Sequence, residues 1–158
     1  GTMGMAISLQ EFFESHPMNY SVVSHNYTAS SQRTAAAIHR TGYKVAKSVL
    51  LKDGESYLLA VLPACHRLHL GQLSQTLHRD LELASETEVS TTFGDCAVGA
   101  IPPSGVLYVL DTIVDEALLE QDDIYFEAGD HEQLIHMKRA DFAKLLGDAR
   151  RAKFSLPD

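Results

Sequence analysis

Lys47 is the residue of this sequence best placed to do chemistry, because it stands inside an apolar stretch. Residues 45–51 are rich in Val, Ala and Leu, and such a run predicts a buried β-strand. An unpaired buried ammonium is very costly, so Lys47 must either reach solvent or hold its charge against an acceptor. Two interpretations follow: a lysine that protects an edge strand from aggregation, or a functional cation.

Two cysteines and several histidines are further candidates. Residues 65–69, Cys-His-Arg-Leu-His, have metal-binding side chains, but a structural zinc site needs a second spaced pair of ligands, which the sequence lacks. We therefore expect no metal, and we expect His66 and His69 at the surface. Cys96 and the distant His131 could form a thiolate and base, whereas a buried, unreactive thiol is the commoner outcome.

The loop of residues 95–105 is stiff. Pro102 and Pro103 remove two amide donors and fix φ, while Gly99 and Gly105 permit backbone shapes that other residues resist. Such a loop can bring main chain close to a ligand. The alternative is a simple connection between a helix and a strand.

Short strands and short helices must position these residues. Lys52-Asp53-Gly54 predicts a tight turn between strands 45–51 and 56–62, and Gly129-Asp130 predicts a second hairpin, between 124–127 and 133–138. Ser8 and Ser85 each begin a capping-box pattern. Helices are predicted from residue 8 to before Pro17 and over 28–39, 68–78, 86–93, 115–119 and 141–151, with further strands over 20–25, 80–84 and 106–113.

This alternation predicts an α/β protein of the α+β type, with a mixed, curved β-sheet and helices packed outside it. The length of 158 residues and the hydrophobic fraction of 45% predict one domain over residues 1–158, of which residues 1–4 resemble an expression remnant. Two cysteines and no apolar run of about 20 residues favour a cytoplasmic protein without a membrane span. The net charge of -8 argues against DNA binding, so any RNA contact must be local.

Four blocks of sequence resemble the YbaK/ProX family of free-standing aminoacyl-tRNA deacylases, which is related to the editing insertion of bacterial prolyl-tRNA synthetase. The resemblance covers residues 20–146 and implies hydrolysis of the ester between a wrong amino acid and the 3′-terminal adenosine of tRNA, without metal or cofactor. The blocks are Val45-Ala46-Lys47-Ser48, Ala60-Val61-Leu62-Pro63-Ala64, Gly99-Ala100-Ile101-Pro102-Pro103 and Ala128-Gly129-Asp130-His131.

The same resemblance implies the site residues. Catalytic roles fall on Lys47, Gly99 and His131, and the substrate-binding positions are Ser48, Ala100, Ile101, Pro102 and Pro103. Lys47 would hold phosphate or ribose oxygens of the terminal adenosine, and amides near Gly99 and Ala100 would donate to the developing oxyanion.

The implied partners are the 3′ end of an aminoacyl-tRNA, with tRNA-Pro the first candidate, and an optional aminoacyl-tRNA synthetase. A small pocket that admits Ala-, Ser- or Cys-sized groups is the expected selectivity device. Two alternatives stay open: a catalytically silent module that binds tRNA or a synthetase, and a cysteine hydrolase that uses Cys96.

Overall fold

The computed structural model describes residues 5–24, 42–97 and 100–158. The helix predicted over residues 28–39 and the candidate Gly99 lie outside these residues. The helical elements are α1 (Ile7–Ser15), α3 (Leu70–Leu77), α4 (Glu86–Thr92), the 3-10 helix η1 (Gly105–Tyr108), α5 (Glu116–Leu119) and α6 (Arg139–Leu146). In the described part of the chain, no helix is long and apolar enough to cross a membrane.

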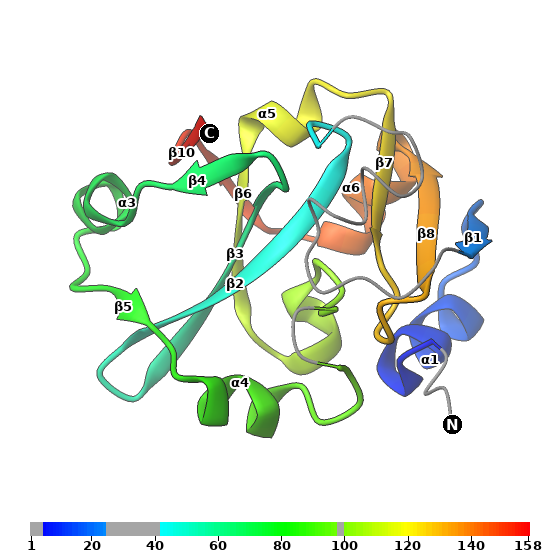
Figure 1. The fold of residues 1–158 in the computed structure, drawn as a ribbon, viewed down its shortest axis with the longest axis horizontal. Helices are drawn as coiled ribbons and strands as arrows, with labels where there is room; N and C mark the ends of the chain where they lie inside the picture. The colour runs from blue at the N-terminus through cyan, green and yellow to red at the C-terminus, as the bar shows by residue number, and fades with distance from the viewer. Residues whose placement is uncertain (1–4, 25–41, 98–99) are drawn as a thin grey trace.

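A twisted mixed sheet forms the centre of the molecule (Figure 1). Its strands follow the order β1-β8-β7-β2-β3-β6-β9, and β5 adds to β2. The sheet contains parallel pairs, such as β2 with β7 and β3 with β6, as well as antiparallel pairs, such as β2 with β3 and β7 with β8. The strands are β1 (Ser21–Ser24), β2 (Val45–Asp53), β3 (Ser56–Pro63), β5 (Glu82–Leu83), β6 (Asp111–Asp115), β7 (Asp123–Glu127), β8 (Gln133–Lys138) and β9 (Arg150–Ala152). The mixed sheet and the α/β class are as predicted.

The β2–β3 hairpin is the longest antiparallel pair of this sheet. It turns at Gly54, whose φ of +62° suits glycine. Lys47 lies opposite Leu62 in the register. Because β2 lies between β7 and β3, the charge of Lys47 does not guard an edge, and that interpretation is wrong.

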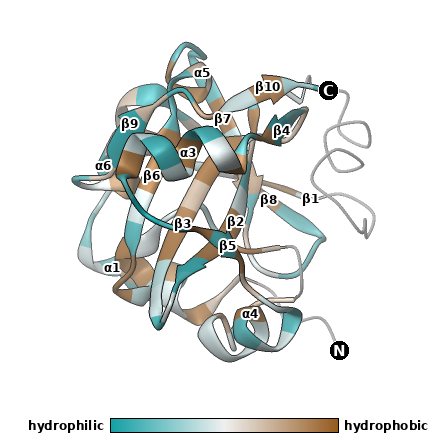
Figure 2. Cartoon of the chain, turned by 90° about the vertical axis from the view of Figure 1, so that its left-hand side faces the viewer, coloured by the Kyte–Doolittle hydropathy of each residue, from teal (hydrophilic) through white to brown (hydrophobic). Residues whose placement is uncertain are grey.

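The two faces of the hairpin enter different apolar clusters. Ala46 and Leu50 pack in a cluster with residues of α1 and α6, whereas Leu51 packs in a second cluster with Leu73 of α3 and Phe154. This alternation is the period of two that a strand buried on both faces requires. Figure 2 shows hydrophobic residues along the central strands, with α3 in front of them and α1 on another side.

Three predicted elements differ from the structure. Ser8 does not cap α1, because its hydroxyl and amide donate to Asp95 Oδ2, at 2.7 Å and 3.0 Å, from a loop far along the chain. The predicted strand 106–113 begins only at Asp111, since η1 occupies its first part. The helix predicted over residues 141–151 is α6, which ends at Leu146; Gly147, whose φ is +63°, follows it, and β9 begins at Arg150. The capping box at Ser85 is confirmed.

Candidate functional site

Two main-chain carbonyl groups hold the Lys47 ammonium. Nζ donates to the carbonyl oxygen of His66 at 2.6 Å and to that of Ala64 at 3.4 Å. An ammonium has three N–H donors, so these two bonds leave one for another acceptor. Carbonyl groups carry no formal charge, and they therefore orient the cation without neutralising it.

Burial also affects the protonation of this lysine. Desolvation lowers the pKa of Lys47 below its usual value, and the charges of Asp158 and Cys65 act in the opposite direction. Lys47 is only half buried, so the ammonium stands at the boundary between core and solvent. A cation in this position can meet a ligand after limited desolvation.

Ser48 connects β2 to the loop of residues 95–105, here called the proline loop, on the other face of the sheet. Neighbouring side chains of a strand point to opposite faces, and Ser48 Oγ donates to the carbonyl oxygen of Ile101 at 3.4 Å. The same loop is tied to the second hairpin, because the amide of Ala97 donates to Gly129 O at 2.7 Å. The hairpin register already pairs residues 45–48 with residues 60–64, so the structure brings all four sequence blocks together, while the Lys47 ammonium lies on the opposite face of β2 from Ser48.

In the proline loop, Ala100 does not offer a free amide. Ala100 is fully buried, and its N–H donates to Ala97 O at 3.0 Å. Pro102 and Pro103 are buried and have no N–H to give. The expectation that the Ala100 amide awaits an oxyanion is therefore wrong, because a local turn already uses that donor.

His131 is a buried residue of the turn that connects β7 to β8. Its side chain is 1% exposed, its φ is +61°, and Nδ1 lies 4.0 Å from Glu127 Oε1. Asp130 Oδ1 accepts the amides of Glu132 and Gln133, both at 2.9 Å, and so fixes the turn. His131 thus stands against a buried carboxylate rather than at an open surface.

The prediction that His66 lies at the surface is wrong. His66 is only 5% exposed, and its Nδ1 is 2.8 Å from Ser155 Oγ, because a late segment of the chain covers it. His69 is exposed, as predicted, and accepts the amide of Gln72 at the start of α3. No sequence signal marked His66, since its partner is 89 residues away.

The environment of Cys96 does not favour a thiolate. Burial raises the pKa of this thiol to about 12, and Sγ lies 3.4 Å from Asp95 Oδ1 and 3.2 Å from the Tyr108 hydroxyl. Near neutral pH the group is a protonated thiol that donates to the Asp95 carboxylate. Among the described residues, no three His, Cys, Asp or Glu side chains gather in a possible metal site.

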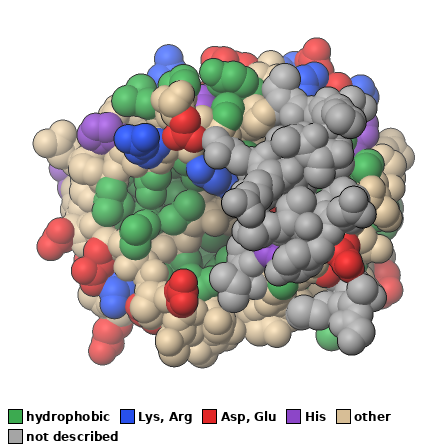
Figure 3. All heavy atoms as spheres, viewed as in Figure 1, with side chains coloured by type: hydrophobic (Ala, Val, Ile, Leu, Met, Phe, Trp, Pro, Cys, Tyr) green, Lys and Arg blue, Asp and Glu red, His purple; other side chains and the backbone are tan. Residues whose placement is uncertain are grey.

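Apolar surface lies on the same face of β2 as Lys47. Val49 follows Lys47 by two residues, and Val49, Leu68 and Leu70 are partly buried hydrophobic residues of the α3-side cluster. In Figure 3, hydrophobic side chains gather in a hollow on the left of the face that Figure 1 shows, with Lys or Arg side chains beside it. Cationic and apolar groups are therefore close on this face.

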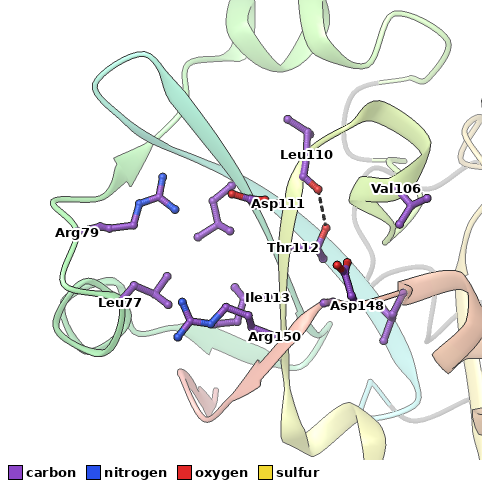
Figure 4. A pocket seen from close by; sticks show the side chains of 12 residues that line it. Leu77, Arg79, Val106, Leu110, Asp111, Thr112, Ile113, Asp148 and Arg150 are labelled. Atoms are coloured by element: carbon purple, nitrogen blue, oxygen red, sulfur yellow. Dashed lines mark hydrogen bonds between the residues drawn. The ribbon is translucent and has the colours of Figure 1, made fainter.

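A cavity of about 280 Å³ lies at the other end of β3 (Figure 4). Leu58 and Ile113 line it, and the side chains of Arg79 and Arg150 extend on one side of it. Leu58 precedes Leu62, the partner of Lys47, by four residues, which is roughly 13 Å along a strand. This cavity is therefore separate from the surroundings of Lys47.

Fold and site together define a small mixed α/β domain with a lysine charge held beside apolar surface. The structure is similar to a candidate trans-editing enzyme for prolyl-tRNA synthetase, with a TM-score of 0.82 and 23% identity over 94% of this chain and 95% of that one. A scaffold protein from an epitope-grafting design study matches with a TM-score of 0.82 and 22% identity over 96% of each chain. A candidate signal transduction protein from Marinobacter aquaeolei matches with a TM-score of 0.72 and 21% identity, over 95% of this chain but 30% of its own.

These similarities, all below 25% identity, establish the fold. The model of the aminoacyl-tRNA editing domain matches residues 25–145, and the chain belongs to that family. The resemblance to the YbaK/ProX group is thereby confirmed. A comparison with curated proteins finds no match.

Proposed function

We propose that this protein is a trans-editing deacylase that removes a small, wrongly attached amino acid, of the size of Ala, Ser or Cys, from tRNA. We propose tRNA-Pro as the first tRNA to test, the cytoplasm as the location, and a synthetase as an optional partner. Membership of the editing-domain family supports the proposal. The observation that carries it is the Lys47 ammonium, which carbonyl groups orient in an interior strand without cancelling its charge.

Lys47 would act as the anchor of the tRNA end. Its remaining N–H donor can bind a phosphate or ribose oxygen of the terminal adenosine, as an ammonium does readily. The neighbouring apolar surface at Val49 offers a place for the base. A small acidic protein then needs few other contacts with the tRNA.

The reaction is a hydrolysis of the aminoacyl ester. A water oxygen attacks the carbonyl carbon, the bond from that carbon to the ribose oxygen breaks, and the released oxygen takes a proton. The products are the free amino acid and a tRNA with its terminal hydroxyl restored. The contribution of this protein is to fix the ester relative to the attacking water, which lowers the entropic part of the barrier.

A deacylation panel tests the proposal. Ala-, Ser-, Cys- and Pro-charged tRNAs are incubated with wild type, Lys47→Ala and Lys47→Arg, and the remaining ester is measured over time. We expect Lys47→Ala to lower kcat/KM about 10²-fold or more, and Lys47→Arg to retain part of the activity. Lys52→Ala is the control, because Lys52 lies on the same strand but pairs with Glu82 and Glu88. Wild-type rates equal to buffer for every charged tRNA would refute the proposal.

The net charge of -8 favours one alternative, a silent module that binds the tRNA end or a synthetase. Such a module would bind charged tRNA without cleaving the ester. Multiple turnovers by wild type would exclude it.

A further inference from the structure

A second, two-stranded sheet stands next to Lys47. Strand β4 (His66–Leu68) pairs antiparallel with β10 (Ser155–Pro157), with Ser155 opposite Leu68 and Pro157 opposite His66. The residue that contributes the shorter hydrogen bond to the Lys47 ammonium, His66, therefore also belongs to this small sheet. Interactions that hold β10 in place therefore also affect the position of the carbonyl group that binds Lys47.

A buried carboxylate fixes β10. Asp115 is 2% exposed, and its Oδ2 accepts from the amide of Phe154 at 2.9 Å and from the hydroxyl of Ser155 at 2.8 Å. Its other oxygen accepts the amide of Ala117 at the start of α5. One side chain thus ties the segment before β10 to the end of β6.

The hydrogen-bond directions follow from the inventory of donors. A carboxylate only accepts, so the single hydroxyl proton of Ser155 points to Asp115. Ser155 Oγ can then only accept from its other hydrogen-bond partner, His66 Nδ1, at 2.8 Å. His66 must carry a proton on Nδ1, and the chain runs from His66 through Ser155 to Asp115.

We propose that Asp115, Ser155 and His66 form a positioning chain for the Lys47 ammonium. The chain fixes the side chain of His66, while the carbonyl group of the same residue accepts from Lys47 at 2.6 Å. The amide of Asp158 donates to Cys65 O at 2.9 Å and immobilises the preceding residue as well. Ser155 and Asp115 are positioning residues, since they act on the lysine only through His66.

This chain of hydrogen bonds makes the surroundings of Lys47 depend on the hydroxyl of Ser155, which does not contact the lysine. Among the described residues, the charges of Asp158 and Cys65 act on the ammonium, and His66 contacts it through its main-chain carbonyl group. If the chain is opened, β4 loosens and water reaches the ammonium. Since burial is the main cause that lowers its pKa, that pKa then rises toward the ordinary value of a lysine.

Three variants test whether this chain of hydrogen bonds affects Lys47. Ser155→Ala removes the hydroxyl, Ser155→Thr keeps it, and Leu156→Ala changes an exposed neighbour on the same strand. A cavity of about 290 Å³ borders Ser155 and leaves room for the extra methyl group of threonine. The Lys47 pKa is read by NMR of labelled lysine side chains, with the signal assigned from Lys47→Arg.

We expect the Lys47 pKa to rise in Ser155→Ala and to stay at the wild-type value in Ser155→Thr and Leu156→Ala. Nitrogen chemical shifts of the histidine rings should show Nδ1–H in His66 of the wild type. An unchanged Lys47 pKa in a folded Ser155→Ala, or a wild-type His66 protonated only on Nε2, would overturn the inference.

The link to catalysis rests on the proposed function and has a separate assay. Ser155→Ala should lower kcat/KM for deacylation roughly 10-fold, but should cause no further loss in a Lys47→Ala background. Equal losses in both backgrounds would show that Ser155 does not act through Lys47. If the wild type deacylates no tRNA, the proposed function fails, and the NMR measurements still decide the positioning chain.

Discussion

Replacement of Asp115 should destabilise the protein strongly, although the side chain is small, because its carboxylate accepts several buried hydrogen bonds. The carboxylate accepts three hydrogen bonds, from Ala117 N, Phe154 N and Ser155 Oγ, at 2.8–2.9 Å, and the side chain is 2% exposed. Hydrogen bonds to a charged group contribute about 1.5–3 kcal/mol each, and a buried donor left without a partner carries its own cost. Asp115→Ala loses all three bonds, and we expect it to lower the free energy of unfolding by about 3–5 kcal/mol.

Asp115→Asn separates the hydrogen bonds from the packing. Its single carbonyl oxygen can replace Oδ2 and keep the bonds to Phe154 and Ser155, but its NH₂ group then faces the amide of Ala117. We expect a loss of about 1–3 kcal/mol. Urea unfolding followed by circular dichroism gives both values, with Asp111→Asn as the control, because Asp111 lies on the same strand but is exposed. A loss below about 1 kcal/mol for Asp115→Ala would refute the reasoning.

Three further predictions concern other parts of the molecule. Gly105→Ala should cost more than about 2 kcal/mol in urea unfolding, because a Cβ there would overlap Thr112 Oγ1 and Leu110 O, whereas Gly71→Ala, with open space around it, should be neutral or slightly stabilising. The hydrogen bond from the Tyr57 hydroxyl is the main cause that lowers the pKa of Glu88 to about 2. Because that pKa lies below the ordinary 4.5, the ionised Glu88 stabilises the protein above about pH 4.5, and this stabilisation is lost as the pH falls toward 2. The urea midpoint of Glu88→Gln should therefore fall less between pH 5 and pH 2.5 than that of wild type. Cys96, with its pKa of about 12, should react with iodoacetamide at pH 8 much more slowly than a small thiol, and Cys96→Ser should keep any deacylation activity.

Local patterns predicted the elements that local interactions determine. The Asp53-Gly54 turn between two apolar runs predicted the β2–β3 hairpin, and the Ser85 pattern predicted a capping box that both of its hydrogen bonds confirm. These features depend on residues a few positions apart, where backbone preference and hydrogen bonding leave little choice.

Interactions between distant residues could not be predicted in this way. Ser8 has the sequence of a cap, but Asp95 competes for its hydroxyl across 87 positions. His66 is buried because β10 folds over it, and nothing near His66 in the sequence indicates that partner. In both cases the tertiary contact outweighs the local preference.

The candidate site shows the same division. The position of Lys47 in an apolar strand was evident from the sequence, but its two carbonyl acceptors come from the residue after β3 and from the start of β4. The proline loop was expected to be stiff, yet the hydrogen bond that uses the Ala100 amide depends on the local fold of the loop. Residue types indicated what chemistry is available, and only the structure showed which donors are already used.

The short turn at Gly54 affects the site indirectly, because it sets the register of the hairpin and so the face of the sheet on which Lys47 lies. Side chains alternate along β2, so a shift of one residue against β3 would exchange the faces of Lys47 and Ser48. The lysine would then point toward Ile101, and the serine toward the carbonyl groups of Ala64 and His66. An insertion of one residue between Lys47 and the turn, several positions away, would thus disable the site without changing any residue in it.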